Sequence, residues 1–181
     1  MVQVLIPLAV GFEEIEAVTI IDVLRRADID VITAGLDRNQ VQGAHGICIE
    51  ADMLLDNVEL SLFDMIVLPG GLPGAEHLAK SVKVQEILQT FDANNKRIGA
   101  ICAAPWALKT AGVLKDKYTC YPSFEKKIDA PGYQSECNVV NNHNIMTSKG
   151  PSTSMEFALA IVKELKGEEI YQSLKKALLL T

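Results

Sequence analysis

The sequence lacks every cysteine pattern that would hold a structural metal or form a dithiol. No Cys-x-x-Cys pair occurs, because the four cysteines stand far apart, at Cys48, Cys102, Cys120 and Cys137. This spacing excludes zinc-ribbon sites and thioredoxin-type redox motifs. The histidines at positions 45, 77 and 143 are equally dispersed. We therefore expect no metal and no cofactor, and free thiols that suit a reducing compartment.

The chain also has few positive charges and no long apolar run. Its 17 Lys and Arg against 23 Asp and Glu give a net charge of −6, and the basic residues are scattered. This distribution argues against stable nucleic-acid binding, which needs a basic stripe. No apolar run approaches the ~20 residues of a membrane span, and residues 1–7 carry no positively charged leader. These absences predict a cytoplasmic protein that does not enter a membrane.

What is present is typical of one globular domain. Hydrophobic residues make up 49% and charged residues 22% of the 181 positions, which are ordinary values for a folded soluble chain. A domain of this size buries about 70% of the surface that its unfolded form exposes. No internal repeat, linker or low-complexity segment interrupts the sequence. We expect a single domain over residues 1–181.

Short apolar runs alternate with amphipathic stretches along the chain. Residues 2–8, 13–27 and 30–34 read as strand, helix and strand, with Ile15, Val18, Ile21 and Leu24 at helical spacing. The rhythm resumes with strands at 64–68 and 97–101, each followed by a helix, at 82–91 and 104–111. Such alternation predicts an α/β fold, in which helices cover a parallel sheet.

The remaining segments predict shorter elements around this sheet. The glycine-hinged stretch 40–49 favours a hairpin or an edge strand on one side of the sheet. Further short strands are expected at 118–121, 137–140 and 144–147, before a helix at 152–165 with Pro151 at its first turn. A last helix at 168–180 ends in Ala-Leu-Leu-Leu, which should pack on the body or on a second subunit.

Cys102 follows the predicted strand 97–101 and precedes small residues and a helix. That order is the shape of a nucleophile elbow, where a side chain is exposed at the carboxyl end of the sheet. The free backbone N–H groups of the new helix bias such a thiol toward the thiolate. The alternative is a buried cysteine that acts as a small hydrophobe.

Acidic residues open the helix that follows the first predicted strand. Glu13 and Glu14 read as complements of the helix dipole. Glu16 differs, because Val18 and Ile20 leave it close to the buried face. Beside a thiolate its pKa would be raised by desolvation and like charge, so that it could carry a proton to or from a substrate. A solvated glutamate at a helix start is the alternative.

Two further loops follow predicted strands and should meet Cys102 at the same edge of the sheet. Gly70 and Gly71 let the backbone approach a ligand and point N–H groups at an anion. The loop lacks the Gly-Lys-Ser/Thr of a phosphate-binding loop, and it suits an oxyanion hole or a plain tight turn. The third loop, 148–153, reads by itself as a capping sequence.

Taken together, these motifs resemble the ThiJ/PfpI superfamily, and most closely its branch of the parkinsonism-associated protein deglycase. The matching segments are Gly-x-Glu-Glu-x-Glu at 11–16, Leu-Pro-Gly-Gly at 68–71, Ala-Ile-Cys-Ala-x-Pro at 100–105 and Ser-x-Gly-Pro-x-Thr-Ser-x-Glu-Phe-Ala at 148–158. The resemblance implies a flavodoxin-like three-layer sandwich with a mostly parallel sheet and a homodimer.

The resemblance also implies roles for single residues. Cys102 would be the nucleophile, Glu16 the pocket glutamate, and the amides of Gly70 and Gly71 would face the sulfur. Phe12 and Pro151 would lie around the same pocket.

Three positions depart from patterns within the superfamily. Ala103 stands where its peptidase branches carry a histidine, and Tyr121 where several relatives place a histidine before a proline. His45 aligns with an arginine that reaches the pocket from the partner subunit in some relatives. The glutamine-amidotransferase elbow, Gly-x-Cys-x-Gly, is also missing. A cysteine–histidine nucleophile pair and peptidase activity are therefore not expected.

These residues lead to three hypotheses of different classes. The first is a cofactor-free glyoxalase or deglycase that acts on methylglyoxal-type dicarbonyls or their early adducts, with Cys102 as nucleophile and Glu16 as general acid/base. The second is an oxidative-stress sensor or redox-regulated chaperone that works through a Cys102 sulfinate. The third is a dimeric binding module without turnover.

Overall fold

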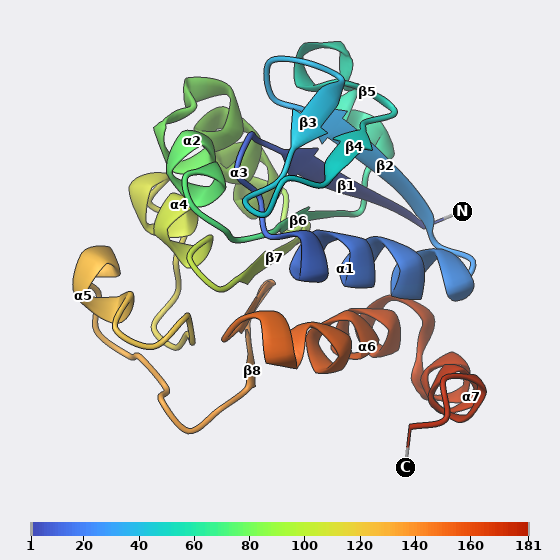
Figure 1. Ribbon diagram of the computed structural model, residues 1–181. Helices are drawn as coiled ribbons and strands as arrows, with labels where there is room; N and C mark the ends of the chain where they lie inside the picture. The colour runs from blue at the N-terminus through green and yellow to red at the C-terminus, as the bar shows by residue number, and fades with distance from the viewer. Residues whose placement is uncertain (1, 181) are drawn as a thin grey trace.

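A seven-stranded sheet lies at the centre of the computed structural model, which describes residues 2–180 (Figure 1). Its strand order is β5-β2-β1-β6-β7-β9-β8, and every neighbouring pair is parallel except β8 and β9. The strands are β1 (Gln3–Leu8), β2 (Asp30–Gly35), β5 (Met53–Leu54), β6 (Met65–Leu68), β7 (Arg97–Ile101), β8 (Val139–Asn142) and β9 (Ile145–Ser148). The predicted flavodoxin-like sandwich with a mostly parallel sheet is confirmed.

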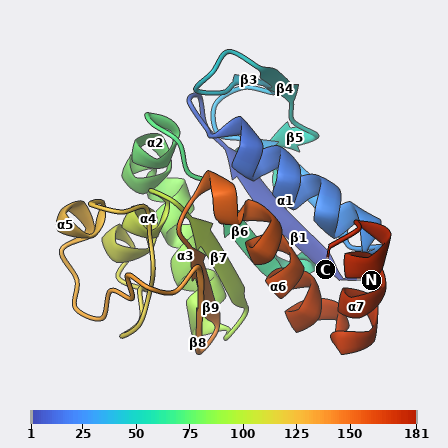
Figure 2. The ribbon, with the colours of Figure 1, turned by 60° about the horizontal axis from the view of Figure 1, so that its bottom comes forward.

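Helices cover both faces of the sheet. One layer contains α1 (Glu14–Arg26), α6 (Ser154–Lys166) and α7 (Glu168–Ala177), and Figure 2 shows α1 and α6 side by side. The other layer contains α2 (Gly74–Lys80), α3 (Val82–Ala93) and α4 (Pro105–Thr110). Both faces of the central strands are therefore buried, which explains why those strands read as continuous apolar runs.

The fully buried strand β6 shows how one strand serves both layers. Met65 and Val67 pack in the cluster that includes α1 and α6, whereas Ile66 and Leu68 pack in the cluster of α2, α3 and α4. This alternation follows from the period of two along a strand. The two cores hold the carboxyl ends of β1, β6 and β7 at fixed positions.

The predicted hairpin at 40–49 is present, but it does not extend an edge of the main sheet. β3 (Gln40–Gln42) and β4 (Cys48–Glu50) pair antiparallel as a separate two-stranded sheet. The N–H of Gly11 donates to the carbonyl of Gln42 over 2.8 Å. This bond places the hairpin beyond the carboxyl end of β1 and above the start of α1 (Figure 2).

Several expected boundaries differ from the structure. Residues 118–121 do not form a strand of the sheet, because Tyr118 makes only an isolated bridge to Tyr133. The helix predicted at 152–165 starts with a 3₁₀ turn, Pro151–Thr153, and continues as α6. The structure also contains elements that the sequence pattern does not predict, namely α2, β5, α5 (Glu125–Ile128) and the 3₁₀ turns Leu55–Asn57 and Leu60–Leu62.

The apolar tail is only partly covered. Leu174 is buried, and Leu178 packs against the core beside it. Leu179, in contrast, is 89% exposed. Packing on the body is therefore observed for Leu174 and Leu178, and packing of the exposed end on a second subunit stays a prediction. Among residues 2–180, no helix combines the length and the apolar character that crossing a bilayer requires.

Candidate active site

The candidate site lies where the strand order changes direction. From β1 the chain continues to β2, which lies on one side of β1, and it later returns to β6, which lies on the other side of β1. In open parallel sheets this switch point leaves a crevice at the carboxyl ends of the strands. The residues that follow β1, β6 and β7 are Glu13–Glu16, Gly70–Gly71 and Cys102, and they converge there.

Cys102 occupies the elbow that the sequence predicts. Its φ of +63° is in the left-handed region, which costs a non-glycine residue about 1 kcal/mol or more. Two backbone hydrogen bonds hold this conformation: its N–H donates to the carbonyl of Ser148 and its carbonyl accepts from the N–H of Tyr121, each over 2.9 Å. The side chain is partly buried and not fully enclosed in the core.

Glu16 is fully buried, on the inner face of α1. Its Oε2 accepts the N–H of Gly70 over 2.8 Å. Its Oε1 is also buried and has no hydrogen-bond partner among residues 2–180. Burial is the main cause that raises the pKa of Glu16 to about 7; the charge of Glu13 acts in the same direction, and hydrogen bonds with Gly70 and Cys102 act against both. A solvated glutamate at the helix start is therefore excluded for this position.

The electrostatics of Cys102 differ from the expected bias toward a thiolate. Burial raises the pKa of the thiol, and so does a charged Glu16 beside it. The backbone N–H groups of Gly71 and Ala103 act in the opposite direction. Because two acids in contact in a buried site cannot both ionise near neutral pH, the pair holds at most one negative charge. When it holds one charge, Cys102 and Glu16 have one proton between them.

Gly70 and Gly71 lie against this pair, and a side chain larger than that of glycine does not fit at either position. A Cβ on Gly70 would stand 2.5 Å from the Cβ of Cys102 and 2.8 Å from Oε2 of Glu16. Gly71 has a φ of +88°, and a Cβ there would stand 2.3 Å from the backbone nitrogen of Glu13. Only one of the two predicted amides is free, since the N–H of Gly70 is used by Glu16. Gly71 and Ala103 provide the amides that face the sulfur.

The other predicted pocket residues divide into two groups. Tyr121 is 49% exposed and flanks the sulfur together with Gly150, where a Cβ would stand 3.2 Å from the tyrosine ring and 3.9 Å from Sγ of Cys102. Pro151 follows directly and begins the 3₁₀ turn before α6. Phe12 is only 1% exposed, so its side chain lies in the core beneath the site. From the sequence, Gly150 is predicted only as part of a capping sequence, and its place beside the sulfur is seen in the structure.

His45 lies on the loop that joins β3 to β4. Its Nδ1 is 2.9 Å from Oε2 of Glu14 and 3.5 Å from Oε2 of Glu13, both in its own chain. Its alignment with an arginine that reaches the partner subunit's pocket in some relatives stays a prediction. The contact with Glu14 could not be seen from the sequence, because the two residues are 31 positions apart.

Comparison with known proteins gives consistent results over almost the whole chain. The model of the DJ-1/PfpI family matches residues 2–164. Protein DJ-1 homolog B of Arabidopsis thaliana is 44% identical over 98% of this chain and 41% of its own length. The glutathione-independent glyoxalase DJR-1.2 of Caenorhabditis elegans is 40% identical over 93% of this chain and 90% of its own.

A solved structure matches equally well. The crystal structure of Drosophila melanogaster DJ-1beta has a TM-score of 0.96 and 39% identity, and the match covers 99% of this chain and 98% of that one. The chain spans less than half the length of the Arabidopsis relative but nearly all of the nematode and fly proteins.

Proposed function

The chain belongs to the DJ-1/PfpI family, and from this premise we propose that it is a cysteine-dependent glyoxalase or deglycase. Its substrates are methylglyoxal-type dicarbonyls or their early adducts with amines and thiols. Cys102 is the nucleophile and Glu16 is the general acid/base. The name of the nematode relative, a glutathione-independent glyoxalase, supports this reaction class.

One observation carries the proposal, namely the contact between a partly exposed thiol and a fully buried carboxyl group with one unpartnered oxygen. With a pKa of about 7, Glu16 can hold or release a proton at physiological pH. The unpartnered Oε1 is the atom on which that proton can reside. Transfer of the thiol proton from Cys102 to Oε1 of the Glu16 carboxylate leaves the negative charge on the sulfur, which is then a nucleophile.

The first step forms a carbon–sulfur bond. The Cys102 thiolate adds to the aldehyde carbon of the dicarbonyl, and the aldehyde oxygen takes the proton from Oε1 of Glu16 to give a hemithioacetal and leave Glu16 as a carboxylate. The N–H groups of Gly71 and Ala103, which face the sulfur, are placed to stabilise the charge on that oxygen as it develops. Tyr121 and Gly150 lie close to the sulfur and limit how a substrate can approach.

The second step moves a proton between neighbouring carbons. Glu16, as a carboxylate, removes the proton from the former aldehyde carbon and returns one to the adjacent carbon, so that the hemithioacetal becomes a thioester. Water then cleaves the thioester to a hydroxy acid and restores the thiol. The overall reaction adds one water to one dicarbonyl, with no net oxidation.

The test is methylglyoxal consumption, with formation of the hydroxy acid, by wild type and three variants. We expect Cys102→Ser to abolish turnover, and Glu16→Gln to keep formation of the sulfur adduct but reduce turnover by at least about 100-fold, as loss of a general acid/base does. Cys48→Ser, on the exposed hairpin, is the matched control and should behave as wild type. Unchanged activity in Cys102→Ser would overturn the proposal. A kinetic comparison of free methylglyoxal with a preformed amine or thiol adduct separates glyoxalase from deglycase activity.

The same pocket supports a second candidate, an oxidative-stress sensor. Two equivalents of peroxide, each releasing one water, would convert the Cys102 thiolate to a sulfinate. The N–H groups of Gly71 and Ala103 and a protonated Glu16 could then donate hydrogen bonds to the sulfinate oxygens and resist further oxidation.

We further propose that two copies of this single-domain chain form a homodimer in the cytoplasm. The support is an exposed apolar patch, consisting of Ile15 and Val18 on α1 and Ile47 on the β3–β4 loop, which are 57%, 47% and 58% exposed. The N–H of Ile47 lies 3.3 Å from Oε1 of Glu14, so that the loop and the first turn of α1 form one surface. Apolar patches of this kind mark association sites.

A further inference from the structure

Two buried hydroxyl groups lie on the 148–153 loop, which joins β9 to α6 beside Cys102. They belong to Ser148 and Thr153, and their oxygens are 2.7 Å apart. Because Ser148 Oγ donates its only proton to the carbonyl of Asn138 over 2.8 Å, Thr153 Oγ1 is the donor in this contact. Thr153 Oγ1 also accepts the N–H of Gly150 over 3.1 Å. One side chain therefore ties Ser148 to Gly150.

Both of the residues that Thr153 ties together lie against Cys102. The carbonyl of Ser148 accepts the N–H of Cys102 over 2.9 Å, which is one of the two bonds that hold Cys102 at its φ of +63°. Gly150 lies close to the sulfur, since a Cβ there would stand 3.9 Å from Sγ. A shift of the 148–153 loop would therefore move the sulfur relative to Glu16.

The hydroxyl of Thr153 does not cap the helix that it precedes. Thr153 occupies the N-cap position of α6, where a threonine oxygen commonly accepts an N–H group of the first turn. Its side chain makes no such hydrogen bond and is directed back to Ser148 and Gly150 instead. Capping of α6 therefore does not explain why a hydroxyl stands at this position.

From this geometry we propose that Thr153 is a positioning residue for Cys102. Its hydroxyl fixes the 148–153 loop, and the loop fixes the backbone of Cys102 so that the sulfur stays in contact with Glu16. The inference rests on the proposed function, in which the sulfur must reach both Glu16 and the aldehyde carbon. In such a step a misplacement of about 1 Å can lower the rate about 100-fold.

Methylglyoxal turnover by Thr153→Val measures this effect. Valine keeps the shape of threonine but can neither accept the N–H of Gly150 nor donate to Ser148. We expect kcat to fall at least about tenfold and KM to change less than about twofold, because the sulfur is misplaced for the chemical step. Thr153→Ser keeps the hydroxyl and should retain most of the wild-type kcat. Ser148→Ala breaks the same contact from its other end and should also lower kcat.

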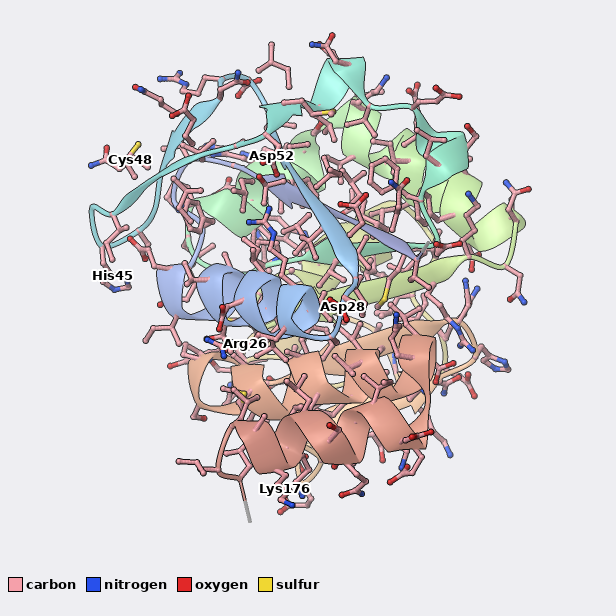
Figure 3. The ribbon with its side chains drawn as sticks, turned by 90° about the vertical axis from the view of Figure 1, so that its right-hand side faces the viewer. Arg26, Asp28, His45, Cys48, Asp52 and Lys176 are labelled. Atoms are coloured by element: carbon pink, nitrogen blue, oxygen red, sulfur yellow. The ribbon has the colours of Figure 1, made fainter. Side chains whose placement is uncertain are left out.

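Thr33→Val is the matched control for the loss of a buried hydroxyl. Thr33 is buried on β2, and its Oγ1 donates to Oδ2 of Asp52 over 2.7 Å and accepts the N–H of Asp52 over 3.0 Å, beside the edge strand β5 (Figure 3). In the sheet, β1 and β6 separate β2 from β7, which leads to Cys102. Thr33→Val should therefore lower the temperature of unfolding, as Thr153→Val does, but keep the kcat of wild type.

Alkylation of Cys102 by iodoacetamide, followed by mass spectrometry, tests the position of the sulfur without relying on turnover. At pH 7 the reaction should be at least about tenfold slower in Thr153→Val than in wild type, because a displaced sulfur cannot pass its proton to Glu16. If wild type does not consume methylglyoxal, the proposed function fails and the alkylation rates alone decide the role of Thr153. Equal or faster alkylation in Thr153→Val overturns that role. So does a loss of kcat that Thr33→Val shares or that Thr153→Ser does not recover.

Discussion

The buried carboxyl of Glu16 makes the charge state of the site depend on pH. In an unfolded chain this group has its usual pKa of 4.5, and in the folded protein the pKa is about 7. Below pH 4.5 the carboxyl is protonated in both states and has no effect on the pH dependence. Between these two values only the folded protein keeps the proton, so stability falls as pH rises. Above pH 7 the carboxyl is charged in both states, and the free energy of unfolding no longer falls with pH on account of this group.

The first prediction is therefore that Glu16→Gln removes this pH-dependent loss. Glutamine keeps an oxygen for the N–H of Gly70 and carries no charge. The difference of about 2.5 pKa units corresponds to about 3 kcal/mol. Between pH 4.5 and pH 8, the free energy of unfolding of the variant should therefore rise by this amount relative to that of wild type. Urea unfolding across this range measures it. Glu169→Gln, exposed on α7, is the control and should follow wild type. A gap that stays constant with pH contradicts the prediction.

The second prediction concerns oxidation of the four cysteines. Cys120 is fully buried, whereas Cys48 and Cys137 are exposed but have no buried acid to share a proton with. Under mild peroxide treatment, mass spectrometry should find two added oxygens on Cys102 before any on the other three. Glu16→Gln should lower the proportion that stops at the sulfinate. Equal oxidation of Cys48, Cys102 and Cys137 would argue against a sensor role.

At the scale of elements, the loop after β6 depends on Gly71. This residue needs a positive φ and also lies where a Cβ would meet the backbone nitrogen of Glu13. We predict that Gly71→Ala destabilises the fold by at least about 2 kcal/mol. Gly112 separates the two causes, because its φ is +74° but nothing lies within 4 Å of its added Cβ. Gly112→Ala should cost only about 1 kcal/mol. Equal losses in thermal unfolding would mean that crowding at Gly71 has no effect.

The sequence predicts the elements that rest on long periodic patterns and misses those that do not. β1, β6 and β7 are continuous apolar runs, and α1 and α6 have clear helical spacing, so their positions are found to within a few residues. α2 begins after Pro73 with a glycine and has only seven residues, and β5 has only two. Tertiary contacts specify such short elements, and local sequence does not.

The sequence predicts which residues meet at the site but not how they bond to one another. Cys102, Glu16 and the Gly70–Gly71 turn stand at strand ends, so topology alone brings them together. How the amides are used was not predictable, since it depends on the side-chain position of Glu16, which takes the N–H of Gly70. The cluster of His45 with Glu14 was missed because no pattern links a hairpin loop to a helix start.

At the scale of the whole molecule, the apolar patch on α1 predicts the oligomeric state. Val18→Glu places a charge at the centre of the patch without lowering helix propensity. We predict a homodimer for wild type and a monomer for this variant in analytical ultracentrifugation. Val82→Glu is the matched control, since Val82 is 68% exposed but lies on α3 in the opposite layer. A monomeric wild type, or a dimeric Val18→Glu, would contradict the role of this surface.

The packing of α1 against α6 has a consequence for protein synthesis. α1 carries Glu16 and packs against α6, which comes about 140 residues later in the chain. A nascent chain that has emerged from the ribosome as far as Gly150 contains Glu16, Gly71 and Cys102 but lacks α6. On that side α1 then has no apolar partner, so the Cys102–Glu16 pair is not held in its folded geometry. Any activity that needs the pair therefore begins only when synthesis of the chain is almost complete.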